Sequence, residues 1–139
     1  MGKEKSPFSV QLLKNQQVIA DKCHVAESFW ERFVGLIGRS GLEVGEGLFF
    51  PGCNSVHMWF MRIAIDVVFL RSETGSDGMT KHIVTSMREN LRPWRPHPAT
   101  DLRAMDALEL ATGAVKKFGI QKGDEILISA IGKQEASHV

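Results

Sequence analysis

The sequence has little that would tie it to a membrane, a nucleic acid or a disulfide framework. Its two cysteines, Cys23 and Cys53, are too few for a disulfide scaffold, so we expect free thiols in a cytoplasmic protein. A net charge of +1 gives no long-range field that would steer an anionic polymer or a membrane surface. The longest apolar stretch, residues 55–70, contains charged residues, and the first ten residues lack the apolar core of a secretory signal. We therefore expect a soluble chain without a membrane span.

Several motifs of catalysis and cofactor binding are also missing. The glycine-rich residues 38–47 lack both the lysine of a P-loop and the strand–helix context of a dinucleotide site. No GxSxG motif is present, and neither cysteine lies in a protease signature. The Cys–His pairs at 23–24 and at 53 and 57 do not have zinc-finger spacing. We expect no metal and no cofactor, and the sequence leaves open whether the protein is an enzyme.

The apolar pattern predicts more strand than helix. Residues 8–23 contain two apolar runs that suit a hairpin, and residues 65–70 (IDVVFL) form a nearly continuous run typical of a strand covered on both faces. An apolar stripe at helical spacing predicts one main helix over residues 29–37. Further strands are expected around residues 48–50, 82–87, 107–111 and 125–131, and a helical turn over 113–119.

Length and short connections indicate a single domain over residues 1–139, with frayed ends at 1–6 and 133–139. The order of the expected elements favours an α+β, mainly β fold. We expect a small, antiparallel, barrel-like sheet with one main helix and a short C-terminal helical turn.

Charged residues inside apolar segments are the most informative feature. A charge on a buried strand must be paired or hydrogen-bonded, because its desolvation costs several kcal/mol. Such residues either form an ion-pair network that fixes the strand register, or line a ligand pocket, and the sequence favours neither. The candidate site residues are Arg32, His57, Arg62, Asp66, Arg95 and Glu109.

Residues 88–103 form a proline-rich, arginine-rich segment in which Trp94 and Arg95 could stack on a base or bind a phosphate. The segment carries four arginines and two acidic residues. Its net positive charge is small compared with that of the basic stripe of a nucleic-acid-binding protein. We therefore do not expect a nucleic acid as the partner.

Five blocks of sequence follow one another along nearly the whole chain: residues 31–39 (ERFVGLIGR), 47–50 (GLFF), 55–70, 90–96 (NLRPWRP) and 108–126. In this order they resemble the domain of unknown function family 192, and in particular its branch with a His-x-x-x-Met-Arg-x-x-Ile-Asp strand. The resemblance implies a small, mainly β fold with a helix packed on it, and no established activity. Genes of this branch often lie near secretion or pilus-assembly genes, which implies an accessory role. All six candidate residues fall on positions of the family pattern.

Three functional hypotheses follow from these observations. The first is a binding or accessory module with a polar pocket for a small anionic ligand, oriented by arginine side chains, or with a partner surface. The second is a hydrolase or lyase in which Asp66 or Glu109 acts with His57 as acid and base. The third is an accessory interaction module of a secretion or pilus apparatus.

Overall fold

The structure is a computed structural model that describes residues 8–25, 42–58 and 63–130. The main helix expected over residues 29–37, and the ends expected to fray, lie outside these ranges. The described elements are β1 (Phe8–Leu12), β2 (Gln17–Val25), β3 (Gly45–Pro51), β4 (Ser55–Val56), β5 (Ile65–Thr74), β6 (Thr80–Leu91), β7 (Ala99–Thr100), β8 (Asp106–Ala111), α2 (Ala114–Phe118) and β9 (Glu125–Ala130).

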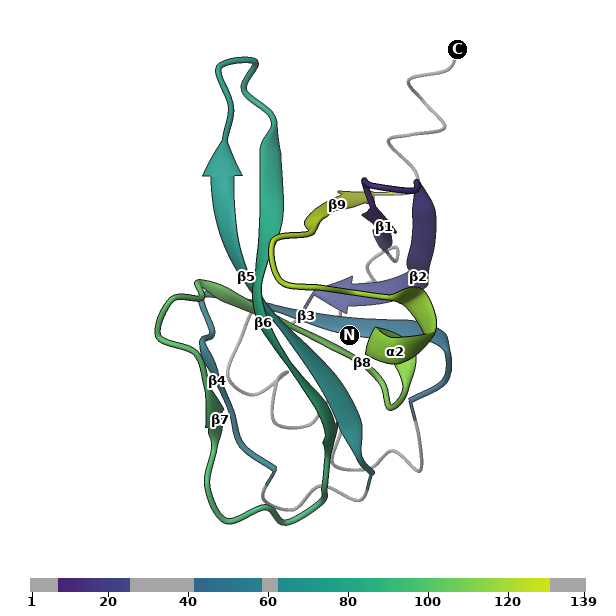
Figure 1. The fold of residues 1–139 in the computed structure, drawn as a ribbon, viewed down its shortest axis with the longest axis vertical. Helices are drawn as coiled ribbons and strands as arrows, with labels where there is room; N and C mark the ends of the chain where they lie inside the picture. Colours follow the sequence, from purple (N-terminus) through teal and green to yellow (C-terminus); the bar gives the residue numbers. More distant parts are fainter. Residues whose placement is uncertain (1–7, 26–41, 59–62, 131–139) are drawn as a thin grey trace, which may run out of the picture.

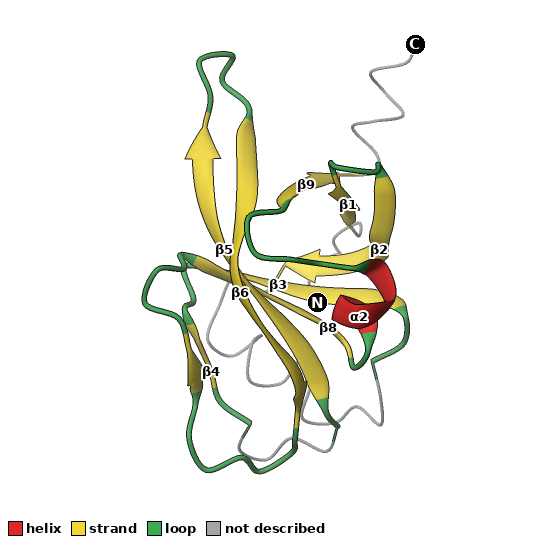
Figure 2. Ribbon diagram, viewed as in Figure 1, coloured by secondary structure: helices red, strands yellow, loops and turns green. Residues whose placement is uncertain are grey.

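Seven of these strands form a closed barrel in the order β1-β2-β3-β8-β5-β6-β9 (Figures 1 and 2). The mainly β barrel and the β1–β2 hairpin are as expected, and α2 is the expected short helical turn. The prediction of an antiparallel sheet is wrong for one pair of strands, because β2 and β3 pair in parallel. Parallel neighbours need a long connection that returns the chain to the same end of the sheet, and the residues between Val25 and Gly45 are numerous enough for one.

The barrel interior is filled by an apolar cluster to which every strand of the barrel contributes. We call this set the interior cluster. Residues two apart on a strand point to the same face, which is why Val68 and Leu70 of β5 and Leu108 and Leu110 of β8 all belong to it. Helix α2 packs on the same cluster through Ala114 and Val115.

A second apolar cluster lies on the outer face of β3, β5 and β8, which the chain around β4 and β7 covers. We call this set the outer cluster. Strands β4 and β7 pair with each other apart from the barrel, at the lower left of Figure 1. The alternate residues of β5 therefore face apolar neighbours too, which explains its nearly continuous apolar run. The outer cluster comprises Leu48, Phe50, Val56, Met58, Ile63, Ile65, Val67, Phe69, Leu91, Ala99, Ala104 and Ala107.

The carboxylate of Asp66 holds α2 against β5 and β6. Its Oδ1 accepts the backbone N–H of Asn90 at 2.8 Å, and its Oδ2 accepts those of Gly113 at 3.1 Å and Val115 at 3.0 Å. Gly113 has a φ of 90°, a conformation that glycine adopts without strain, so the chain can turn from β8 into α2. Because α2 has no capping side chain of its own, Asp66 supplies the acceptor from across the fold.

We expect Asp66→Ala to lower the free energy of unfolding by roughly 3 kcal/mol, since three backbone donors lose a charged acceptor. Urea denaturation of the two proteins measures the loss. Asp21→Ala is the matched control, because Asp21 is an exposed carboxylate on β2. Equal stability of the two variants would contradict the structural role of Asp66.

Candidate functional site

Four of the six candidate residues lie within the described part of the chain. Arg32 and Arg62 fall outside it. His57 is exposed and follows β4, while Arg95 is half-buried in the connection between β6 and β7. Asp66 and Glu109 are both buried, on β5 and β8 respectively.

Glu109 points into the outer cluster. In the barrel, Glu109 lies directly opposite Leu48 of β3 and Val67 of β5, and both of these belong to that cluster. Side chains opposite each other in an antiparallel pair project from the same face of the sheet. The glutamate side chain is thus placed between apolar neighbours and is only 5% exposed.

The carboxyl group of Glu109 is not satisfied by the residues that the structure describes. Its Oε2 atom is buried and has no hydrogen-bond partner there. Because burial disfavours the charged form, the pKa of the carboxyl is raised from 4.5 to about 8. Near neutral pH this side chain is therefore a carboxylic acid with an O–H group to donate.

His57 and Arg95 lie on two segments whose backbones are hydrogen-bonded to each other. The backbone N–H of Trp94 donates to the carbonyl of Met58 at 2.8 Å, and that of Asp101 donates to the carbonyl of Asn54. His57 is exposed, whereas its chain neighbours Val56 and Met58 are buried in the outer cluster. The segment that carries Arg95 is thus held beside the segment that carries His57.

Asp66 is separated from these residues by the sheet itself. It lies opposite Leu110, a member of the interior cluster, so it projects from the other face of the sheet than Glu109 does. Its carboxylate is also occupied by three backbone amides. The structure thus separates Asp66, on the barrel side of the sheet, from Glu109, on the side of the outer cluster, and places the segment of Arg95 beside that of His57.

Two further polar groups were not anticipated from the sequence. Asp101 accepts hydrogen bonds from Thr85, Ser86 and the Arg103 amide; burial alone would raise its pKa, but these bonds hold it below its usual value. An Asp two residues before a bonded amide is the signature of an Asx turn, so the local part was predictable. The contacts with β6 depend on tertiary structure.

The second group is His82 with Asp106, at the barrel interior. Burial lowers the pKa of His82, although Asp106 acts in the opposite direction. The Nδ1–Oδ2 separation of 3.6 Å is too long for a hydrogen bond, and the ring packs edge-on against Phe49. Asp106 instead accepts the Gly52 amide, which links β3 to the start of β8.

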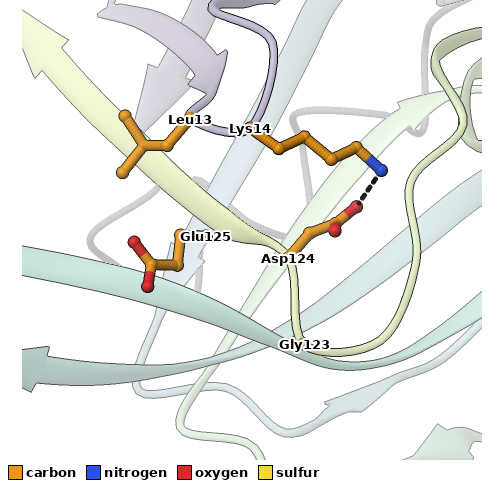
Figure 3. Close-up of a pocket in the computed structure, with 5 residues that line it drawn as sticks. All are labelled: Leu13, Lys14, Gly123, Asp124 and Glu125. Atoms are coloured by element: carbon orange, nitrogen blue, oxygen red, sulfur yellow. Dashed lines mark hydrogen bonds and ion pairs between the residues drawn. The ribbon is translucent and has the colours of Figure 1, made fainter.

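A surface hollow of about 340 Å³ lies where the β1–β2 turn meets the start of β9 (Figure 3). Its charged groups are already paired: Lys14 donates to Asp124 at 2.9 Å and also to the Gly119 carbonyl, and Glu125 forms an ion pair with Lys81. None of the six candidate residues lines this hollow. We assign it a structural role in fixing the turn before β9.

Neither a metal centre nor a helix long and apolar enough to cross a membrane is found in the described ranges. A metal centre would need at least three His, Cys, Asp or Glu side chains close enough to share an ion.

Comparison with known proteins supplies the family. Residues 10–128 match the sequence model of DUF192, whose description reads "Uncharacterized ACR". The chain belongs to the DUF192 family. The resemblance seen in the five sequence blocks is thus confirmed, and the chain is a small domain of a family without an assigned activity. No curated protein matches the sequence.

Two solved structures share the fold of this DUF192 chain. A protein of unknown function from Novosphingobium aromaticivorans is 22% identical with a TM-score of 0.69, over 87% of this chain and 83% of that one. A Sinorhizobium meliloti protein suggested to be a transcription regulator is 21% identical with a TM-score of 0.71, over 91% and 98%. At these identities the likeness establishes the fold alone.

The state of Glu109 can be read from the pH dependence of stability. Between about pH 4.5 and about pH 8 the folded chain holds a proton on Glu109 that the unfolded chain releases. The unfolding equilibrium of wild type, relative to Glu109→Gln, should therefore shift toward the unfolded state about tenfold per pH unit through this range. Above about pH 8 the difference levels off.

Urea denaturation at about pH 5, 7 and 9 measures this difference, and Glu89→Gln, an exposed glutamate on β6, is the control. A Glu109→Gln variant whose stability runs parallel to wild type at all three values would show that Glu109 is ionised in the folded protein.

Proposed function

We propose that the protein is a binding module for a small anionic molecule, recognised beside the outer cluster by Arg95 and His57. The supporting observation is the hydrogen bond from the Trp94 amide to the Met58 carbonyl, which fixes the loop of Arg95 against the segment of His57. Two side chains able to carry positive charge are thus held at the border of an apolar cluster.

Arg95 suits the recognition of a carboxylate or a phosphate. Its guanidinium group has five N–H donors in a fixed plane, and the Nη1 atom donates to the His97 carbonyl at 3.0 Å. That bond steadies the side chain while other N–H groups remain to form a bidentate pair with an anion. A half-buried arginine held in this way loses less rotamer freedom on binding than an exposed one.

The apolar neighbours strengthen such an interaction. Small-molecule sites combine a mostly apolar lining with a few placed polar groups, and charge interactions are stronger where water is partly excluded. Val56 and Met58, the chain neighbours of His57, supply the apolar part of such a lining.

No contact among the described residues specifically supports the hydrolase or lyase hypothesis, or the hypothesis of an accessory role in secretion. Of the two acids that could act with His57, Asp66 accepts three backbone amides on the barrel side of the sheet, and Glu109 is flanked by Leu48 and Val67. The roles of Arg32 and Arg62, the single domain and the cytoplasmic location remain predictions from sequence.

Thermal unfolding at increasing anion concentration and constant ionic strength tests the proposal, with phosphate, sulfate, acetate and benzoate as the anions. We expect at least one of them to raise the thermal midpoint of the wild type by mass action. Arg95→Gln should weaken that anion's binding at least tenfold, about 1.4 kcal/mol, because the bidentate contact is lost.

Arg92→Gln is the matched control, since Arg92 is exposed in the same loop and its loss changes the net charge equally. It should bind the anion like the wild type. Equal weakening in both variants would indicate nonspecific attraction, and no midpoint shift with any of the four anions would refute the function.

A further inference from the structure

Trp94 lies at a position where both the backbone and the surroundings disfavour its side chain. It is 61% exposed, and it is the only aromatic residue among the large exposed apolar side chains of the described ranges. Its φ of 61° is in the left-handed region, which bulky side chains rarely adopt and where strain costs stability. The other non-glycine residues with positive φ in these ranges are the polar Gln16 and Asn90. Stability alone therefore does not account for a tryptophan here.

The turn around Trp94 fixes this backbone conformation. Pro93 precedes it, and a proline followed by a residue with positive φ is typical of a type II turn, in which glycine or asparagine normally follows the proline. The backbone N–H of Trp94 donates to the Met58 carbonyl at 2.8 Å. Pro96 and Pro98 restrict the chain that follows. The indole is thus presented to solvent from a backbone that is ordered before any ligand binds.

An exposed indole is suited to stacking on a planar ring. Aromatic rings attract one another in offset geometry beyond the effect of buried area, and a saturated ring lacks this attraction. Tryptophan has only two side-chain torsions, so it loses little conformational entropy when it stacks. Trp94 is joined directly to Arg95, and the Cα atoms of neighbouring residues are about 3.8 Å apart. One small molecule can therefore contact both the indole and the guanidinium group.

A small ligand fits this position better than a protein partner. The core of a protein interface is a contiguous apolar area. In the connection between β6 and β7, however, the exposed neighbours of Trp94 include the polar Arg92 and His97. The other large exposed apolar side chains of the described ranges belong to other segments of the chain: Val18, Val44, Met79, Leu102 and Met105.

We propose that the ligand bound by Arg95 is an anion carried on a planar ring, and that Trp94 stacks on this ring. The inference rests on the proposed function and names the ligand class of the same site. Arg95 pairs with the carboxylate or phosphate group, while Trp94 selects a planar ring over a saturated one. Aromatic carboxylic acids and nucleotides both belong to this class.

Calorimetric titration with two matched pairs of probes tests the inference and separates these two sources. Benzoate and cyclohexanecarboxylate carry the same anionic group on a planar and a saturated ring. Adenosine monophosphate and ribose 5-phosphate share a phosphate and differ by a planar base. In at least one pair, the wild type should bind the planar member at least about threefold more tightly. The pair that shows this preference identifies the source.

Three variants separate stacking from folding. Trp94→Asn removes the ring, and asparagine tolerates a positive φ, so the preference should vanish while the thermal midpoint stays equal to or above that of the wild type. Trp94→Phe keeps a planar ring and should keep the preference. Leu102→Asn is the matched control, because it removes another large exposed apolar side chain, and it should bind like the wild type.

The inference can fail without the proposed function. If anions bind through Arg95 but the wild type shows no preference in either pair, or if the preference persists in Trp94→Asn, the stacking role is refuted and the anion site stands. A lower thermal midpoint of Trp94→Asn would show that the indole stabilises the fold, which also refutes the inference. If neither these probes nor acetate, sulfate or inorganic phosphate binds, both proposals are refuted.

Discussion

Two-sided burial of β5 and β8 is the constraint on which the other features depend. One face of these strands fills the barrel and the other carries the outer cluster, so residues 65–70 of β5 and all of β8 are buried. An acidic side chain at such a position is stable in two ways. It accepts hydrogen bonds, as Asp66 does, or its pKa rises and it is protonated, as at Glu109. The chemistry of the candidate site follows from that choice.

Much of the barrel could be predicted from the sequence because it depends on local pattern. The continuous apolar run of β5 indicated burial on both faces, and the two runs over residues 8–23 indicated a hairpin. The parallel pairing of β2 with β3 could not be predicted, since it depends on which strands become neighbours after the intervening chain has returned. The periodicity of apolar residues describes each strand by itself and does not indicate which strands pair with each other.

The candidate site shows the same limit at the level of single residues. In sequence, Asp66 and Glu109 look alike, as lone acids in apolar strands. The register of β5 with β8 places Asp66 opposite Leu110 and Glu109 opposite Val67, which are on different faces. A shift of one residue would exchange those environments. Polar residues in apolar strands can thus be recognised as unusual from sequence, but their grouping into one site requires the register.

Burial costs stability at Glu109. A leucine at this position would extend the outer cluster and remove a buried oxygen that has no partner among the described residues, so selection for stability alone would not keep a carboxyl group there. Asp66 needs no such explanation, because three backbone amides give its charge a structural role. The charge of Asp66 and the neutral form of Glu109 are thus two responses to the same burial, of which one is stabilised by hydrogen bonds and the other costs stability.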